Sequence, residues 1–306
     1  MSQRMNEIDT QSRIYIITVI YNRSINEIRS LQEFENLLKQ FEETRLIVVD
    51  NSTKEDVLEQ NREIAAQKEW IRYLECGGNI GLSRAYNRAL ATIPQEEEEQ
   101  FWIMLSDDDT KFSMDYLVNG CLQIRREQKR KRRIGKSGEK RDPISILCGV
   151  VRTASGWMSP RSEHTREFAF SSLLKEPKPG IYRDLYPINS GLFLEGGAIQ
   201  KAGGFDENLF LDQIDYLMMD RLRAAGFDKV GVLPGGIWQF FSGEIGALSA
   251  EAAEKRWKIF QKDFNTYCDL AQKPWYYRRY ILGRRRMMLR LQTCQNLCQR
   301  DQKASG

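Results

Sequence analysis

The first third of the chain alternates runs typical of buried strands with segments of helical spacing, and this alternation constrains the fold most. Apolar residues dominate the runs at 14–20, 46–49, 71–74 and 102–105. The segments between them, at 25–41, 57–67 and 82–91, have the apolar spacing of helices. Strands that alternate with helices in this way predict a parallel sheet with right-handed crossovers.

Polar residues follow each predicted strand, and they would gather at one edge of a parallel sheet. These residues are Asn22, Asp50, Asn79 and Asp107. In open α/β sheets, ligands bind at the carboxyl ends of the strands. We therefore expect a ligand site at this edge.

The strongest feature of that edge is a triad of consecutive aspartates, Asp107, Asp108 and Asp109, which follows the run at 102–105. Three carboxylates held together repel one another unless they are paired. Mg²⁺ and Mn²⁺ prefer carboxylate oxygens and would relieve this repulsion. An aspartate-rich turn that caps a helix is the alternative interpretation.

The rest of the chain is less regular. Helices are predicted at 115–124, 199–202, 216–225, 250–270 and 276–300, strands at 144–151 and 230–233, and an apolar run lies at 191–194. Gly226 directly follows one of these helices and is a typical C-terminal cap.

Composition limits the class of protein. A length of 306 residues allows one large domain with an appendage or two domains, and 41% hydrophobic residues are enough for a core. We see no N-terminal apolar stretch for a signal peptide and no run long enough to span a bilayer. The six cysteines form no CxxC pair, and His164 is the only histidine. We expect a reduced, cytoplasmic protein that uses neither a histidine cluster nor a Ser-His-Asp triad.

Four sequence blocks carry a family resemblance. They read Thr-Val-Ile-Tyr-Asn-Arg at 18–23, Val-Val-Asp-Asn-Ser at 48–52, Gly-Asn-Ile-Gly-Leu-Ser-Arg-Ala-Tyr-Asn at 78–87 and Leu-Ser-Asp-Asp-Asp at 105–109. In this order they resemble the inverting glycosyltransferase family 2, and its rhamnosyltransferase-like members in particular. Segments 189–191 and 203–215 resemble the acceptor side of that family, and the resemblance covers about residues 14–240.

The resemblance implies an α/β protein with the Rossmann-like GT-A fold, in which a mixed, mainly parallel sheet is flanked by helices. A C-terminal helical extension would follow. We accordingly divide the chain into a disordered N-terminus at 1–12, a GT-A catalytic domain at 13–245 and a C-terminal helical region at 246–306. A basic insertion at 125–142 would interrupt the catalytic domain.

A nucleotide-sugar donor needs partners for its base and ribose, and the resemblance implies where they lie. Tyr21 would pack against the base, Asp50 would accept a hydrogen bond from the base or ribose, and Gly78 would let the backbone approach the ligand. The expected donor contacts are Tyr21, Asn22, Asp50, Asn51, Gly78, Asn79, Arg84, Asp107 and Asp108. The alternatives are core packing for Tyr21, a helix cap at 50–52 and an ordinary exposed arginine at Arg84.

The resemblance also implies a metal site. Asp107 and Asp109 would form an Asp-x-Asp pair that holds Mg²⁺ or Mn²⁺ on the donor pyrophosphate, while Asp108 turns toward the ribose or the backbone. Many relatives place a histidine after the last strand, where this chain has Gln239. Glutamine is the weaker ligand for a transition metal, so we expect lower metal affinity, a preference for Mg²⁺ or weaker metal dependence.

Inversion at the anomeric carbon requires a base that takes the proton of the acceptor hydroxyl. Asp215 is the first candidate, because it lies six residues before Arg221, as the family's base does. Asp212 is the second, and a helix beginning near it would place both carboxylates on one face. Acids that merely favour a helix N-terminus are the alternative. Acceptor contacts are expected at Asn189, Ser190 and Gly191.

Two segments concentrate positive charge, although the net charge is only +4. Segment 125–133 has no interleaved aromatic residues, so we expect a solvated, mobile insertion or attraction to anionic lipid rather than nucleic-acid binding. Segment 275–282 mixes Trp and Tyr with Arg, as helices on a membrane surface do. A terminal helix packed on the domain is the alternative.

The resemblance implies an inverting glycosyltransferase that moves a sugar from a dTDP-rhamnose-like or UDP-sugar donor to a glycan or lipid-linked glycan in cell-surface polysaccharide synthesis. We expect it in the cytoplasm or attached peripherally to the inner face of the plasma membrane, with an anionic membrane surface and no nucleic acid as partner. A non-catalytic nucleotide-sugar or lipid-binding relative is the first alternative. A nucleotidyltransferase is the second, although residues 21–24 are not the Gly-rich phosphate loop that it would need.

Overall fold

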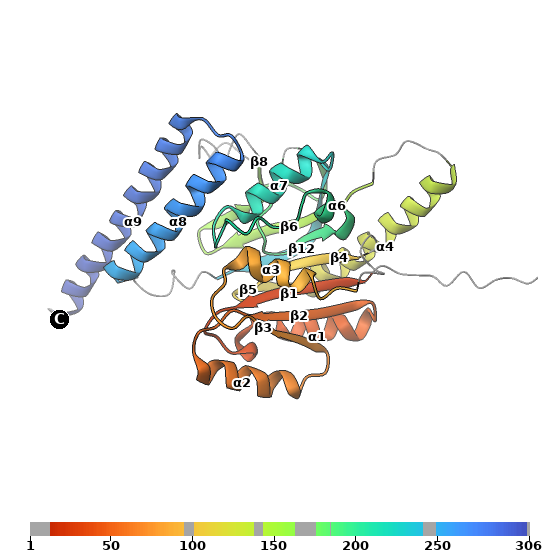
Figure 1. The fold of residues 1–306 in the computed structure, drawn as a ribbon, viewed down its shortest axis with the longest axis horizontal. Helices are drawn as coiled ribbons and strands as arrows, with labels where there is room; N and C mark the ends of the chain where they lie inside the picture. The colour runs from red at the N-terminus through yellow and green to blue at the C-terminus, as the bar shows by residue number, and fades with distance from the viewer. Residues whose placement is uncertain are drawn as a thin grey trace, which may run out of the picture.

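The structure is a computed structural model that describes residues 13–94, 101–137, 143–162, 176–183, 185–240 and 249–304. In this part of the chain, ten strands form one mixed sheet with helices on both faces (Figure 1). The N-terminus at 1–12, His164 and the expected domain boundary at 245/246 lie outside the described residues, so the expectations that concern them stay predictions.

The N-terminal half of the sheet is parallel, as the sequence predicted. Its strands lie in the order β3 (Ile71–Glu75), β2 (Thr44–Asp50), β1 (Ile14–Ile20) and β4 (Trp102–Asp107). The crossovers contain α1 (Leu31–Gln40), α2 (Glu55–Ala66) and α3 (Leu82–Leu90). Strands β1, β2 and β4 are buried on both faces, which explains their nearly continuous apolar runs.

The single helix predicted at 25–41 is two elements. A 3₁₀ turn, η1 (Ile25–Glu27), begins at a capping box set by Ser24, and α1 starts only afterwards. Asn61 of α2 accepts a hydrogen bond from the backbone N–H of Ile25 at 2.9 Å. Helical periodicity could not reveal this break, because Asn61, which stabilises the turn, belongs to another helix.

The C-terminal half of the sheet mixes strand directions. β11 (Leu192–Glu195) is antiparallel to β4 and β6 (Ile146–Thr153), whereas β12 (Val230–Gln239) is parallel to β6. Three short strands complete this half of the sheet: β5 (Thr110–Phe112), β7 (Gly156–Ser159) and β9 (Gly180–Tyr182). A separate two-stranded sheet consists of β8 (Arg161–Ser162) and β10 (Leu185–Tyr186). Because β5 follows β4 and pairs with the end of β12, the aspartate triad lies beside Gln239.

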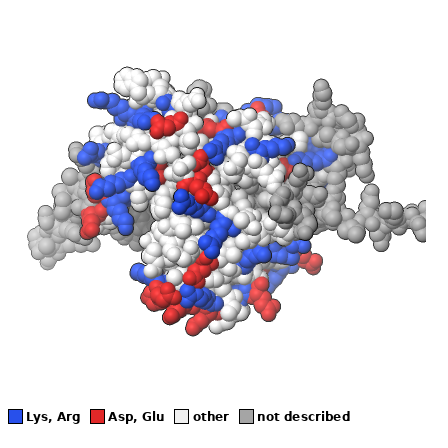
Figure 2. All heavy atoms as spheres, in the orientation of Figure 1, with Lys and Arg blue, Asp and Glu red and all other residues white. Residues whose placement is uncertain are grey.

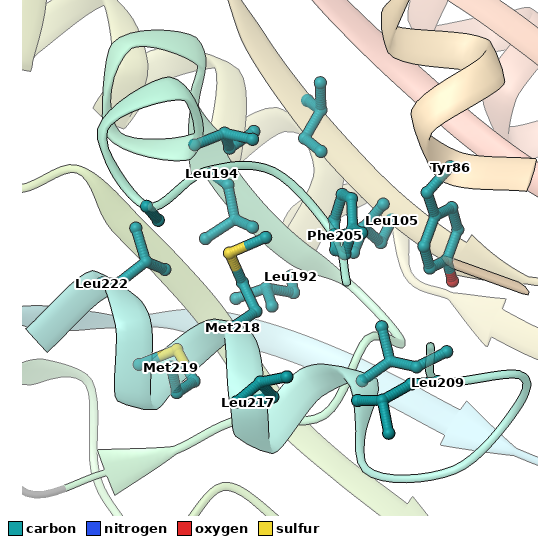
Figure 3. Packing of buried hydrophobic residues seen from close by; sticks show 14 of the residues in the cluster. Tyr86, Leu105, Leu192, Leu194, Phe205, Leu209, Leu217, Met218, Met219 and Leu222 are labelled. Carbon is teal, nitrogen blue, oxygen red and sulfur yellow. The ribbon is translucent and has the colours of Figure 1, made fainter. Parts of the chain in front are cut away.

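Two clusters of buried side chains cover the two faces of the sheet. On one face, α1 packs on the strands through Phe34, together with α4 (Met114–Ser137). On the other face lie α3, α6 (Gly196–Lys201) and α7 (Ile214–Ala224). Figure 3 shows Met218 and Leu222 of α7 beside Leu192 and Leu194 of β11.

The last two helices, α8 (Ala250–Leu270) and α9 (Trp275–Ala304), form a hairpin at one end of the molecule (Figure 1). Trp257, Phe260 and Phe264 of α8 and Tyr277 of α9 belong to the same buried cluster as α7. The hairpin therefore packs on the core of the sheet domain, as the alternative interpretation of this segment expected. Among the described residues, no helix combines the length and the apolarity needed to cross a membrane.

The sequence predicted a mobile insertion at the basic segment. The structure instead has a helix there as far as Ser137, because α4 continues into the segment. Arg125 pairs with Glu43 at 2.7 Å, and Lys131 pairs with Glu195. Lys and Arg are good helix formers, so such a run extends a helix where neighbours supply carboxylates. Figure 2 shows basic and acidic side chains interspersed on one face of the molecule.

Candidate functional site

A cleft of about 890 Å³ lies at the carboxyl ends of β1, β2 and β4, where the sequence predicts a ligand site. The predicted residues that line it are Tyr21, Asn51, Asn79, Asp107, Asp108, Asp109, Asn189, Asp212, Asp215 and Gln239. The predicted residues outside its lining are Asn22, Asp50, Gly78, Arg84, Ser190 and Gly191. The fold thus brings residues from distant parts of the chain into one cavity.

Asp107 is the last residue of β4, and two neighbours hold its carboxylate. Its Oδ2 accepts a hydrogen bond from Gln239 Nε2 at 2.9 Å and another from the Ser190 hydroxyl. Burial raises the pKa of Asp107, whereas these two hydrogen bonds lower it. Ser190, which we expected to contact the acceptor, orients this aspartate instead.

Asp108 and Asp109 lie in the turn between β4 and β5. Burial raises the pKa of Asp108 to about 6, an effect that its ion pair with Arg23 at 3.0 Å opposes and the charge of Asp107 increases. Burial, followed by the charges of Asp107 and Asp108, raises the pKa of Asp109 to about 7. The three carboxylates therefore resist being charged together unless a cation joins them.

Oxygen atoms suited to a metal ion lie in the same cleft. Asp109 Oδ1, Gln239 Oε1 and Asn189 Oδ1 are buried without a hydrogen-bond partner among the described residues. These residues include no group of three or more His, Cys, Asp or Glu side chains that could hold a metal alone. Mg²⁺ is commonly bound by one or two carboxylates together with substrate phosphates. The residues therefore fit a metal ion that arrives with a diphosphate.

Asp109→Asn is expected to stabilise the metal-free protein at pH 8. The pKa of Asp109 is about 7 in the folded protein against an ordinary value of 3.8, so the folded state holds this proton more tightly. The free energy of unfolding therefore falls as the pH rises from about 4 to about 7, and a neutral Asn removes that loss. Urea unfolding in EDTA at pH 5.5 and pH 8 measures both effects.

The control for this variant is Asp228→Asn, because Asp228 pairs with Arg183 away from the cleft. Its effect on stability should not share the pH dependence of Asp109→Asn. A metal-free Asp109→Asn protein that is less stable than the wild type at pH 8 would contradict the expectation.

Asn51 and Asn79 form a hydrogen-bonded wall in the cleft. Asn51 Nδ2 donates to Asn79 Oδ1 at 3.1 Å, and Asn51 Oδ1 accepts from the backbone N–H of Ile80 at 2.9 Å. Tyr21 also lines the cleft, and its side chain is 49% exposed, so it is not a core residue. These residues offer fixed amide groups and an exposed ring to a planar ligand.

Asp50 has a different place from the one expected. It is fully buried and accepts hydrogen bonds from Asn61 Nδ2 at 2.7 Å, the Tyr73 hydroxyl at 2.8 Å and the backbone N–H of Ser52 at 2.9 Å. Burial, and after it the hydrogen bond to Asp50, raises the pKa of Tyr73. Asp50 thus supports the loop that carries Asn51, rather than contacting the base or ribose.

Asp50→Ala is expected to lower the free energy of unfolding by about 3 kcal/mol, because buried donors lose their acceptor. Urea unfolding measures this difference. Glu59→Ala, an exposed position on the neighbouring α2, is the control and should change stability by less than about 0.5 kcal/mol. Equal effects of the two substitutions would count against a supporting role for Asp50.

Asn22, Gly78 and Arg84 also lie outside the cleft lining. Asn22 has a φ of 49°, and its Oδ1 accepts from the backbone N–H of Thr53 at 2.9 Å, so it joins two loops. Gly78 has a φ of 126° in the loop before α3. Arg84 is exposed and pairs with Glu207 at 3.6 Å, which matches the alternative of an ordinary helical arginine.

Of the acceptor segment at 189–191, only Asn189 lines the cleft. Gly191 has a φ of 82°, and its N–H donates to the carbonyl of Leu105 at 2.9 Å. A Cβ atom at this position would lie 2.7 Å from Ile237, so the glycine permits close packing at the start of β11.

Asp215 lies in the first turn of α7, and its Oδ1 accepts a hydrogen bond from the backbone N–H of Tyr216 at 2.8 Å. Asp212 lies before the helix, because the N-cap residue Gln213 has a left-handed φ of 65°. The expected pair of carboxylates on one helix face is therefore wrong. Both oxygens of Asp212 instead accept hydrogen bonds from Arg256 of α8.

The part of the cleft that α8 supplies was missed in the sequence. Lys255, Arg256 and Ile259 line the cleft from this helix. Asp263, also in α8 and fully buried, accepts hydrogen bonds from the backbone N–H groups of residues 210–212 at 3.1, 2.7 and 2.8 Å. No local signal marks these residues, because a helical pattern does not show which element the helix will contact.

Two kinds of comparison relate the chain to known proteins. The model of the family described as Glycosyl transferase family 2 matches residues 15–129, and no curated protein matches the chain. Among solved structures, the mannosyltransferase PcManGT from Pyrobaculum calidifontis, in complex with GDP-Man and Mn²⁺, has a similar fold. Its TM-score is 0.50 at 13% identity, over 84% of this chain and 64% of that one.

Two further solved structures are similar at TM-scores of 0.48. S. aureus TarS 1–349 has 16% identity over 88% of this chain and 69% of that one. GalNAc-T7 with UDP, GalNAc and Mn²⁺ has 12% identity over 83% of this chain and 48% of that one. Identities this low concern the fold alone. The expected GT-A fold is confirmed, and the resemblance to family 2 is confirmed over residues 15–129.

Proposed function

From the glycosyltransferase family 2 segment at 15–129, we propose that the protein transfers a sugar from a nucleotide-sugar donor to an acceptor hydroxyl, with inversion at the anomeric carbon. The observation that carries this proposal is that one cleft contains the aspartate triad at the end of β4, the Asn51–Asn79 wall and Asp215 of α7. A donor bound there would lie between groups suited to its diphosphate and a carboxylate suited to act as base.

The donor would bind with its base at Tyr21 and Asn51 and its diphosphate at the aspartate triad. Asp107 and Asp109 would hold Mg²⁺ or Mn²⁺, which would neutralise the charge that grows on the leaving nucleoside diphosphate. Asp108 forms an ion pair with Arg23 at 3.0 Å, so its part would be to position that arginine and the turn. Gln239 holds Asp107 through its Nε2, and its Oε1 is oriented by that contact.

Asp215 would act as the base. As the acceptor oxygen forms its bond to the anomeric carbon, the bond between that carbon and the diphosphate oxygen breaks. The proton of the acceptor hydroxyl passes to Asp215, and the leaving diphosphate takes the electron pair. Asp212 is less suited to this role, because both of its oxygens accept hydrogen bonds from Arg256.

We place the reaction in cell-surface polysaccharide synthesis at the inner face of the plasma membrane, with a dTDP-rhamnose-like or UDP-sugar donor and a glycan or lipid-linked glycan acceptor. One face of α9 supports the membrane part of this proposal: Tyr276, Tyr280 and Met287 are exposed at helical spacing, and Arg279 and Arg286 are exposed beside them. Binding of the protein to lipid vesicles tests the membrane part. The proposal predicts stronger binding to phosphatidylglycerol vesicles than to phosphatidylcholine vesicles, and equal or weaker binding would count against it.

Thermal unfolding with nucleotides tests the donor site. We expect UDP, dTDP or one of their sugars to raise the melting temperature in Mg²⁺ or Mn²⁺ but not in EDTA, since only the folded protein binds them. Release of the nucleoside diphosphate from the sugar on addition of acceptor then tests turnover. A nucleotide response without turnover would favour a non-catalytic binding protein, and no response to any nucleotide would overturn the proposal.

A further inference from the structure

A second hollow, of about 310 Å³, lies between α7, α8 and α9. It adjoins the cleft, because Gln213 and Tyr216 line both cavities. Tyr216 directly follows Asp215 in the chain, so the hollow lies next to the proposed base. The steps assigned to the cleft do not use it.

The hollow combines apolar walls with positive charge. Its charged groups are Arg284 and Arg285, which are consecutive on α9. Its apolar walls are Phe260, Phe264, Tyr277, Ile281 and Met288. A ligand with an anionic group attached to an apolar or ring-shaped part would match both features.

Arg285 is the group in this hollow that most requires a partner. Its guanidinium lies 5.3 Å from the centre of the Phe260 ring, and its Nε atom is buried with no hydrogen-bond partner in the described part of the chain. Burial lowers the pKa of Arg285, the charge of Arg256 lowers it further, and the charge of Asp212 raises it. Withdrawing a guanidinium N–H donor from water without an acceptor is costly.

Two acidic groups of the surrounding elements are already engaged. Asp212 is bound at both oxygens by Arg256, and Asp263 accepts three backbone N–H groups from residues 210–212. Neither carboxylate forms an ion pair with Arg285 among the described contacts. Among the described residues, the Nε donor of Arg285 is therefore left for an anion that the protein binds.

We propose that this hollow binds a phosphate ester group of the acceptor, with Arg284 and Arg285 donating to the phosphate oxygens. The inference rests on the proposed function, since it gives the acceptor a place beside Asp215. Guanidinium groups bind phosphate with two parallel hydrogen bonds, and the apolar walls suit the hydrocarbon chain of a prenyl phosphate. A lipid-linked acceptor and a soluble phosphorylated glycan share this ester.

The donor diphosphate has a separate place, which makes the two sites distinguishable. The aspartates at the end of β4 require a cation before they can hold a diphosphate. Arg284 and Arg285 carry the positive charge themselves. Phosphate binding in the hollow should therefore persist in EDTA, whereas nucleotide binding in the cleft should not.

Calorimetric titration of the full chain with geranyl monophosphate in EDTA tests the proposal. We expect the wild type to bind geranyl monophosphate at least tenfold more tightly than geraniol, because two guanidinium groups recognise the phosphate. Arg285→Met should lower that affinity at least tenfold. Lys262→Met, at an exposed position of α8, is the matched control and should change it less than twofold. No binding, or equal binding by the wild type and Arg285→Met, would overturn the proposal.

Inorganic phosphate separates the two sources of the ester. Tighter binding of geranyl monophosphate than of inorganic phosphate would support a lipid-linked acceptor. Equal binding of the two, with the same loss in Arg285→Met, would support a soluble phosphorylated glycan at the same site.

A stability measurement distinguishes a phosphate-binding role of Arg285 from a structural one. Met keeps an apolar side chain of similar reach and removes a partly buried guanidinium whose Nε has no hydrogen-bond partner among the described residues, so Arg285→Met should unfold at an equal or higher urea concentration. A large loss of stability would overturn the proposal. Failure of the nucleotide thermal response, with geranyl monophosphate binding retained, would reject the donor site and leave the phosphate site standing.

Discussion

Asp215→Asn is expected to lower the turnover rate about a thousandfold while donor affinity stays within about twofold of the wild type. Asn keeps the size of the side chain and an oxygen that can accept the Tyr216 N–H, so the first turn of α7 stays in place. It cannot take the proton of the acceptor hydroxyl at neutral pH. Product formation at saturating donor and acceptor measures the turnover rate, and a nucleotide titration measures donor affinity.

Two further variants make this test specific. Asp212→Asn removes the partner of Arg256 rather than the base, so we expect a loss of no more than about tenfold. Asp269→Asn changes an exposed aspartate that pairs with Arg278, and its turnover should match the wild type. A turnover rate of Asp215→Asn within tenfold of the wild type, or a larger loss in Asp212→Asn, would remove Asp215 from the role of base.

Asp107→Asn is expected to abolish the metal-dependent response to nucleotide and to lower kcat/KM at least about 100-fold. Asp107 is the partly buried carboxylate at the end of β4 that lines the cleft, and the proposed metal ion would bridge it to the diphosphate. Thermal unfolding with UDP or dTDP, with and without Mn²⁺, measures the response. Initial rates over a range of Mn²⁺ concentrations measure the loss of activation.

Ser190→Ala separates the charge of Asp107 from its orientation. This variant removes the hydroxyl that donates to Asp107 but keeps the carboxylate. We expect it to retain metal activation, with a loss in kcat/KM of about tenfold because one hydrogen bond to a charged group is missing. Undiminished Mn²⁺ activation in Asp107→Asn would show that the aspartate triad does not hold the metal.

Local sequence was sufficient for the parallel half of the sheet. The runs at 14–20, 46–49, 71–74 and 102–105 correspond to β1, β2, β3 and β4, and helices lie between them. A run of apolar residues has to be buried whatever its neighbours are, so it marks a strand without knowledge of its partners. The polar residues at the ends of these strands then had to lie at one edge.

Which of those polar side chains face the cleft could not be predicted. Asp50 and Asn51 are adjacent in the chain, yet Asp50 is enclosed by Asn61 and Tyr73, while Asn51 lines the cleft. Arg84 likewise turns to Glu207. These choices depend on hydrogen-bond partners from other elements, which strand and helix periodicity does not specify.

By itself, the sequence determined the fold class, the strand ends that form the cleft and the place of the aspartate triad, because burial of apolar runs is a local requirement. Only the tertiary structure decided that α8 supplies Arg256 to the cleft and that α9 places Arg285 in the hollow beside it. The physical reason is that these contacts join residues far apart in the chain. Their energy comes from the charges and packing of both partners together, and neither segment shows it alone.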